Sequence, residues 1–147
     1  MTFLKRFLSS LALSSIAFAM AFTEVAGAAD PIKIGMTVSS QGRFALAAQS
    51  GERGLKIWIN DVNSRGGISI NGQKRKIELV SLDDRSDKAM VPRVYETLIK
   101  EKGVDILFGP FGSTLTGAAA NTTEQFDKFL MIWSASSDAI YEQGYKY

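Results

Sequence analysis

Two short loops of small polar residues are the parts of this sequence best suited to chemistry. Residues 109–113 (Gly-Pro-Phe-Gly-Ser) follow an apolar segment, 104–108, and residues 134–137 (Ser-Ala-Ser-Ser) follow another, 129–133. Each loop precedes a helical pattern. The first backbone N–H groups of a helix lack intrahelical acceptors and lie at the positive end of the helix dipole. Such a helix start binds anions, so we expect a carboxylate or phosphate there.

Hydroxyl groups in both loops suggest a two-sided grip on one small zwitterion. Ser113 or Thr114 occupies the expected N-cap position, where its hydroxyl would cap the helix, bind a ligand, or do both. The same two readings apply to Ser136 and Ser137. Gly112 lets a ligand approach the backbone, and Phe111 provides an apolar wall. The Ala135 carbonyl would accept from an ammonium group, unless an acid from elsewhere does so.

Composition excludes several classes of site. The 147 residues include no cysteine and no histidine. The sequence therefore has no disulfide framework, no thiolate nucleophile, no Ser-His-Asp triad and no imidazole metal site. A net charge of +2 argues against a nucleic-acid partner. The glycine patterns of dinucleotide and P-loop sites are both absent, so dinucleotide and P-loop chemistry lack support and we expect no cofactor. Because histidine, cysteine and a nucleophile pair at a strand end are also missing, we expect no enzymatic activity.

An acidic cluster at Asp83, Asp84 and Asp87 is the one place where a metal ion would be conceivable. Its spacing does not fit an EF-hand loop. We therefore expect these carboxylates to lie in a solvated loop, with Asp87 as a possible N-cap of the next helix.

The N-terminus carries the pattern of a secretory signal peptide. Lys5 and Arg6 precede an apolar segment, 7–22, and Ala26-Gly27-Ala28 matches a cleavage site. The apolar segment has about 16 residues, whereas a membrane span needs about 20. We predict cleavage after Ala28, a periplasmic mature chain of residues 29–147 and no membrane insertion afterwards. An uncleaved anchor is the alternative.

Periodicity predicts an α/β domain with a parallel sheet. Strands are expected at 32–38, 76–82, 104–108 and 129–133, because these segments are apolar and rich in β-branched residues. Helices are expected at 45–64, from about 91 to Gly103, and at 114–128, with Trp58 and Gly54 on the inward face of the first. Asn71-Gly72 predicts a hairpin between strands. Alternation of this kind implies three layers, with helices on both faces of the sheet.

The order of these segments resembles the start of the type I periplasmic solute-binding proteins, in the branch that binds branched-chain amino acids and amides. The resemblance rests on 32–36 (Ile-Lys-Ile-Gly-Met), 51–68, 77–80 with the acidic cluster, 104–113 and 135–137. It covers nearly all of residues 29–147. In that family the chain continues into a hinge and a second lobe, so this sequence resembles an incomplete first lobe.

The resemblance implies a binding component of an ABC importer, with a permease as partner and hinge closure around an amino acid or amide. It places Ser113 and either Ser136 or Ser137 at the ligand's carboxylate. It also implies an aromatic residue above the ligand, for which Phe44 is available although Ala47 aligns better. Two other functions remain open: a ligand sensor of the same fold, and a small exported flavodoxin-like enzyme.

Overall fold

A four-stranded parallel sheet forms the centre of the molecule, and a computed structural model describes it within residues 29–147. The spatial order of its strands is β4-β1-β5-β6. The predicted signal peptide, 1–28, lies outside the described residues. The elements in chain order are β1 (Ile32–Thr37), α2 (Ala45–Ser64), β2 (Ile68–Ile70), β3 (Gln73–Arg75), β4 (Ile77–Leu82), α3 (Val91–Lys100), β5 (Ile106–Phe108), α4 (Ser113–Gln125), β6 (Leu130–Met131) and α5 (Asp138–Tyr141).

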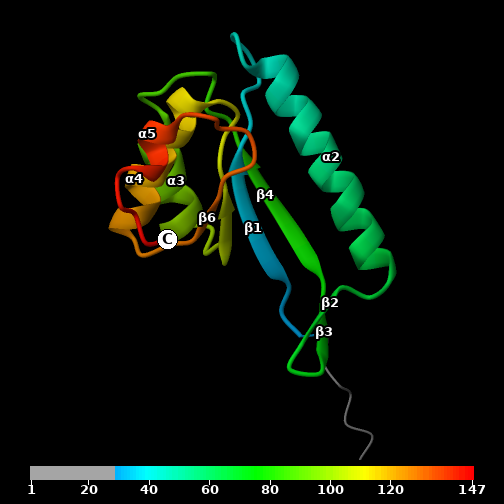
Figure 1. Cartoon of the computed structure of the whole chain (residues 1–147). Coiled ribbons are helices and arrows are strands. Elements are labelled where there is room, and N and C mark those ends of the chain that lie inside the picture. The colour runs from blue at the N-terminus through cyan, green and yellow to red at the C-terminus, as the bar shows by residue number, and fades with distance from the viewer. Residues whose placement is uncertain (1–28) are drawn as a thin grey trace, which may run out of the picture.

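Helices cover both faces of the sheet, as the alternating pattern predicts (Figure 1). Successive residues of a strand point to opposite faces. Ile34 of β1 therefore packs in a cluster with Ile59 and Val62 of α2. The neighbouring Gly35 faces the other layer, where a Cβ atom would lie 3.0 Å from the Val104 side chain. The parallel, three-layer α/β class is thus confirmed.

Helix α2 has the predicted bounds but a narrower buried face than the sequence suggested. Only Ala48, Ile59 and Val62 are buried. Trp58 is 44% exposed, and a Cβ atom at Gly54 would meet nothing within 4 Å. The prediction that both face inward is wrong, because α2 lies alone on its side of the sheet among the described residues (Figure 1). A single helix on a sheet buries only one stripe of its surface.

Turn residues place the segments between helices and strands. Gly67 ends the α2 turn with φ +98°, and a Cβ atom there would overlap the Arg75 backbone. The predicted hairpin is present as the antiparallel pair β2–β3, with Asn71 and Gly72 at positive φ. Pro92 lies in the first turn of α3, where a missing N–H costs no helical hydrogen bond.

Strand β6 is shorter and more exposed than predicted. It covers two residues rather than five, and within residues 29–147 its one strand partner is β5. Leu130 is buried, whereas Phe129 and Met131 are 53% and 42% exposed. An almost wholly apolar segment such as 129–133 predicts a buried strand. It is instead an edge strand with one covered face, because α2 does not extend over it (Figure 1).

Helices α3 and α4 close the other face of the sheet. Tyr95 of α3 is fully buried, and its hydroxyl donates a 2.6 Å hydrogen bond to the Phe108 carbonyl. Burial raises the pKa of Tyr95.

In residues 29–147 the helices include none with the length and apolar character that a membrane crossing requires.

Candidate functional site

The loops after β5 and β6 are joined by hydrogen bonds at the carboxyl edge of the sheet. The Ser136 N–H donates to the Ser113 hydroxyl at 3.1 Å. The Gly112 N–H donates to the Ser134 hydroxyl at 3.3 Å, and that hydroxyl donates to the Pro110 carbonyl at 3.1 Å. Ligands of open parallel α/β sheets bind at this edge. The predicted proximity of the two loops is confirmed.

Helix α4 begins without a side-chain cap. Its N-cap is Gly112, with φ +88° and no capping side chain, so the prediction that Ser113 or Thr114 is the N-cap is wrong. The positive φ of Gly112 brings Ser113 inside the helix, and its hydroxyl turns to Ser136 instead. The first helical hydrogen bond runs from the Thr116 N–H to the Gly112 carbonyl. The N–H groups of 113–115 therefore have no acceptor within the helix.

Ser137 occupies the N-cap position of α5, yet its hydroxyl makes no capping hydrogen bond. Ser113 and Ser137 line the same cavity of about 330 Å³, together with Lys88. The Ala135 carbonyl accepts a long contact, 3.5 Å, from the Tyr141 hydroxyl. The residues expected at a ligand head group are thus gathered at one place.

Three aromatic rings lie beside these loops. Phe44 and Phe111 have ring centroids 6.0 Å apart, and Phe111 and Trp133 have centroids 5.9 Å apart. A Cβ atom at Gly112 would lie 3.3 Å from Cε1 of Phe44. Phe44 therefore reaches the loop, whereas Ala47 lies within α2.

Trp133 is the residue that sequence reasoning missed. Its Nε1–H donates a 2.6 Å hydrogen bond to the Gly109 carbonyl, and its ring fits against Gly51. Its position at the end of an apolar segment indicated only a buried strand. The sequence signal that could have found this contact is Gly51, because a glycine within the predicted helix 45–64 lets another residue approach its backbone closely.

The acidic cluster anchors the loops after β1 and β4. Asp84 is fully buried, and it accepts from the Thr37 and Ser39 hydroxyls at 2.6 and 2.5 Å. Its other partner is the Ser86 N–H at 2.9 Å. The prediction of a solvated loop is wrong for Asp84, because these hydroxyls replace water around its carboxylate.

The neighbouring acids have other local roles. Asp83 accepts from the N–H and the hydroxyl of Ser40. Partial burial raises the pKa of Asp83, but these hydrogen bonds outweigh it and leave the pKa below its usual value. Asp87 is not the N-cap of α3, because it accepts from the Ala89 N–H before the helix begins. Among residues 29–147 these carboxylates do not converge on a metal-sized site.

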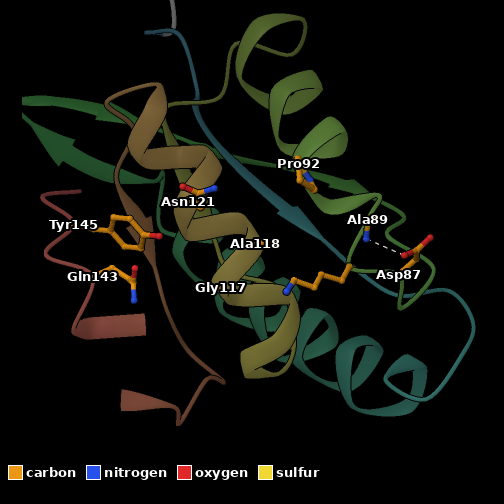
Figure 2. Close-up of a pocket in the computed structure, with 9 residues that line it drawn as sticks. Asp87, Ala89, Pro92, Gly117, Ala118, Asn121, Gln143 and Tyr145 are labelled. Atoms are coloured by element: carbon orange, nitrogen blue, oxygen red, sulfur yellow. Dashed lines mark hydrogen bonds between the residues drawn. The ribbon is translucent and has the colours of Figure 1, made fainter. Parts of the chain in front are cut away.

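A larger cavity, about 750 Å³, flanks the site instead of coinciding with it. Figure 2 shows its walls: the segment before α3, the side of α4 and the chain after α5. Lys88, Gly117 and Tyr145 also line the 330 Å³ cavity, so the two hollows adjoin. The unpaired N–H groups and the serine hydroxyls gather at the start of α4. Donor chemistry therefore places the candidate site there, although the larger hollow lies farther along the helix.

Comparison with known proteins assigns the family. The family model described as "Periplasmic binding protein" matches residues 31–147. The chain belongs to this family. A relative, Leu/Ile/Val-binding protein homolog 8 of Brucella suis, is 29% identical over 93% of this chain and 31% of its own length. The chain thus spans about a third of that relative.

Solved structures of periplasmic binding proteins share the fold. The substrate-binding protein of a branched-chain amino acid transporter from Streptococcus pneumoniae, in complex with isoleucine, has a TM-score of 0.69 and 27% identity over 77% of this chain and 31% of its own. A solute-binding protein from Rhodopseudomonas palustris, in complex with benzoate, has a TM-score of 0.63 and 25% identity over 75% of this chain and 29% of its own. These relatives are solute-binding proteins rather than enzymes. The family implies a location outside the cytoplasm.

Proposed function

We propose that this chain supplies the first-lobe ligand surface of a solute-binding protein that delivers an amino acid or amide to the permease of an ABC importer. The observation that supports it most is the uncapped start of α4 beside the Ser113–Ser136 hydrogen bond. Free N–H groups, two nearby hydroxyls and a helix dipole are complementary to a carboxylate.

The head group of an amino acid fits these groups in a definite way. Its carboxylate accepts from the N–H groups of the first α4 turn and from the hydroxyls of Ser113 and Ser136 or Ser137. Its ammonium donates to the Ala135 carbonyl, whose present partner at 3.5 Å is weak and easily displaced. Gly112 keeps the backbone accessible, and Phe111 covers one apolar side.

A single lobe binds weakly by this scheme. Each hydrogen bond to a charged group contributes about 1.5–3 kcal/mol, while association costs at least about 4 kcal/mol. Three such bonds near the upper end of that range leave an affinity near the millimolar range, for which the free energy is about −4 kcal/mol. Closure of a second lobe over the ligand would supply the remaining contacts, as in other hinged binding proteins.

Nuclear magnetic resonance titration of the 147-residue chain with L-leucine and L-glutamine tests the proposal, because it detects millimolar binding. The amide resonances of 113–115 and 136–137 should shift and saturate with either ligand. Ser113→Ala should weaken the response about tenfold, whereas Thr114→Ala, in the same turn, should leave it unchanged. Shifts confined to residues outside these loops would refute the site.

A further inference from the structure

An aromatic row, defined as Phe44, Phe111 and Trp133, forms the apolar surface next to the head-group site. The middle ring, Phe111, is tilted by 55° against Phe44 and by 60° against Trp133. Phe111 directly precedes Gly112 and Ser113 in the loop. The row therefore begins within one or two residues of the groups that would hold a carboxylate.

The loops themselves contain no leucine, isoleucine, valine or methionine. Residues 39–44, 109–113 and 134–137 are polar, small or aromatic, apart from Pro110. The large apolar side chains that these three loops themselves present are therefore aromatic, namely Phe44 and Phe111. Flat, rigid rings pack best against another ring, in tilted or offset geometry.

Hydrogen bonds and close packing hold the row in place. The Phe44 N–H donates to the Ser86 hydroxyl at 3.2 Å, and that hydroxyl donates to the Gln41 carbonyl at 2.7 Å. The indole of Trp133 is bonded to Gly109 and seated on Gly51. The rings are thus positioned before a ligand arrives, which lowers the entropy cost of binding.

Positive charge lies next to the row. The guanidinium carbon of Arg43 is 4.4 Å from the centroid of Phe44. This contact holds a cation over one face of the ring, near loops that already present hydrogen-bond donors. An anionic group attached to a ring is therefore favoured on two counts, by charge and by aromatic packing.

We propose that the ligand of this site is an aromatic carboxylate, in which a flat ring lies against the aromatic row and the carboxylate lies at the start of α4. This inference rests on the proposed function and specifies its ligand class. Benzoate and L-phenylalanine share that chemistry and differ in whether an ammonium group accompanies the carboxylate.

The decisive experiment compares benzoate with cyclohexanecarboxylate, which has the same head group on a saturated ring of similar size. Amide and Trp133 indole resonances of the 147-residue chain are followed during both titrations. Benzoate should bind about three- to tenfold more tightly, the ratio that one or two aromatic pairs supply. A parallel pair, L-phenylalanine and L-leucine, should show the same order, and their affinities relative to benzoate show whether the ammonium is accommodated.

Variants assign the preference to the row. Phe111→Leu keeps apolar bulk but removes the middle ring, so it should bring the benzoate to cyclohexanecarboxylate ratio close to one. Phe129→Leu, at an exposed phenylalanine before β6, is the matched control and should leave the ratio unchanged. The amide spectrum of each variant reports whether it is folded.

The outcomes separate this inference from the proposed function. Equal or tighter binding of the saturated acid and of leucine at 113–115 would overturn the aromatic ligand and leave a carboxylate site intact. No response of those amides to any of the four compounds would overturn both. An unchanged ratio in Phe111→Leu would also overturn the role of the row.

Discussion

The Ser136 N–H and the Ser113 hydroxyl are hydrogen-bonded at 3.1 Å across 23 residues of chain. This contact joins the loops after two adjacent parallel strands, and it leaves the hydroxyl proton of Ser113 free to donate. A ligand carboxylate would accept that proton together with the N–H groups of the α4 start. The Ser113 hydroxyl thus joins the two loops and would also donate to a ligand. Its removal should therefore weaken ligand binding and make the two loops less ordered.

Ser113→Ala should therefore weaken binding of a carboxylate probe such as benzoate by about 1–3 kcal/mol, the cost of a lost hydrogen bond to a charged group. Titration followed by nuclear magnetic resonance measures the change. Ser113→Thr retains the hydroxyl and should recover most of the affinity. Loss of affinity in both variants alike would point to packing at this position instead of a donor.

Alanine substitutions at Gly51 and Gly54 of α2 should change the free energy of unfolding in opposite directions. A Cβ atom at Gly51 would overlap the Trp133 indole, whereas one at Gly54 would meet nothing within 4 Å. Gly54→Ala should raise the free energy of unfolding by about 0.5–1 kcal/mol through helix propensity. Gly51→Ala should lower it by about 1–3 kcal/mol through overpacking.

Urea unfolding measures both effects, and Trp133 fluorescence reports the displaced ring. Trp58→Phe makes that signal specific, because the chain has two tryptophans. Equal stabilisation by both alanines would mean that Trp133 is not seated on α2.

Asp84→Ala should destabilise the fold by about 2–4 kcal/mol, because it leaves the Thr37 and Ser39 hydroxyls and the Ser86 N–H without their buried acceptor. The matched substitution Asp87→Ala removes one exposed hydrogen bond to Ala89 and should cost less than about 1 kcal/mol. Chemical unfolding compares the two. Similar costs would show that the Asp84 carboxylate does not anchor these loops.

Acid should weaken the fold partly through Asp83. Its pKa in the folded chain lies below the ordinary value of 3.8. A carboxyl group with a lowered folded pKa stabilises the fold fully above the unfolded pKa, and the contribution is lost as pH falls through the folded pKa. The free energy of unfolding, measured from pH 5 downward, should therefore decrease less in Asp83→Asn than in the wild-type chain. Ser40→Ala, which removes the hydroxyl donor to Asp83 and keeps the N–H donor, should act in the same direction by a smaller amount. A steeper loss in either variant would contradict this assignment.

Export should remove the first 28 residues. When the full chain is expressed in a Gram-negative bacterium, mass spectrometry of the periplasmic fraction should find Ala29 at the N-terminus. Ala28→Arg replaces the small residue that a cleavage site requires and should leave the longer form attached to the membrane. Ala29→Arg tests whether cleavage tolerates a charged residue directly after the cleavage site. Recovery of the uncut wild-type chain would favour the anchor interpretation.

The sequence by itself determined the order of the elements and the sheet type. The apolar segments of β1 and β4 and the helical period of α2 are local signals, and both survive because buried strands and amphipathic helices need regular spacing. The loops 109–113 and 134–137 were also found from sequence, because parallel strands bring their carboxyl ends to one edge. Family resemblance was visible in the same segments.

Only the tertiary structure decided which side chains the fold covers and where each hydroxyl turns. Trp58 and Met131 are exposed because no described helix extends over them. The hydrophobic pattern of a segment does not show which other elements will cover it. Asp84 is buried because hydroxyls from β1 and its loop, 45 and 47 residues away, replace its water. Ser113 turns from capping to Ser136 because one positive φ at Gly112 moves the helix start. Burial and hydrogen bonding depend on distant partners, and those partners are fixed only when the chain has folded.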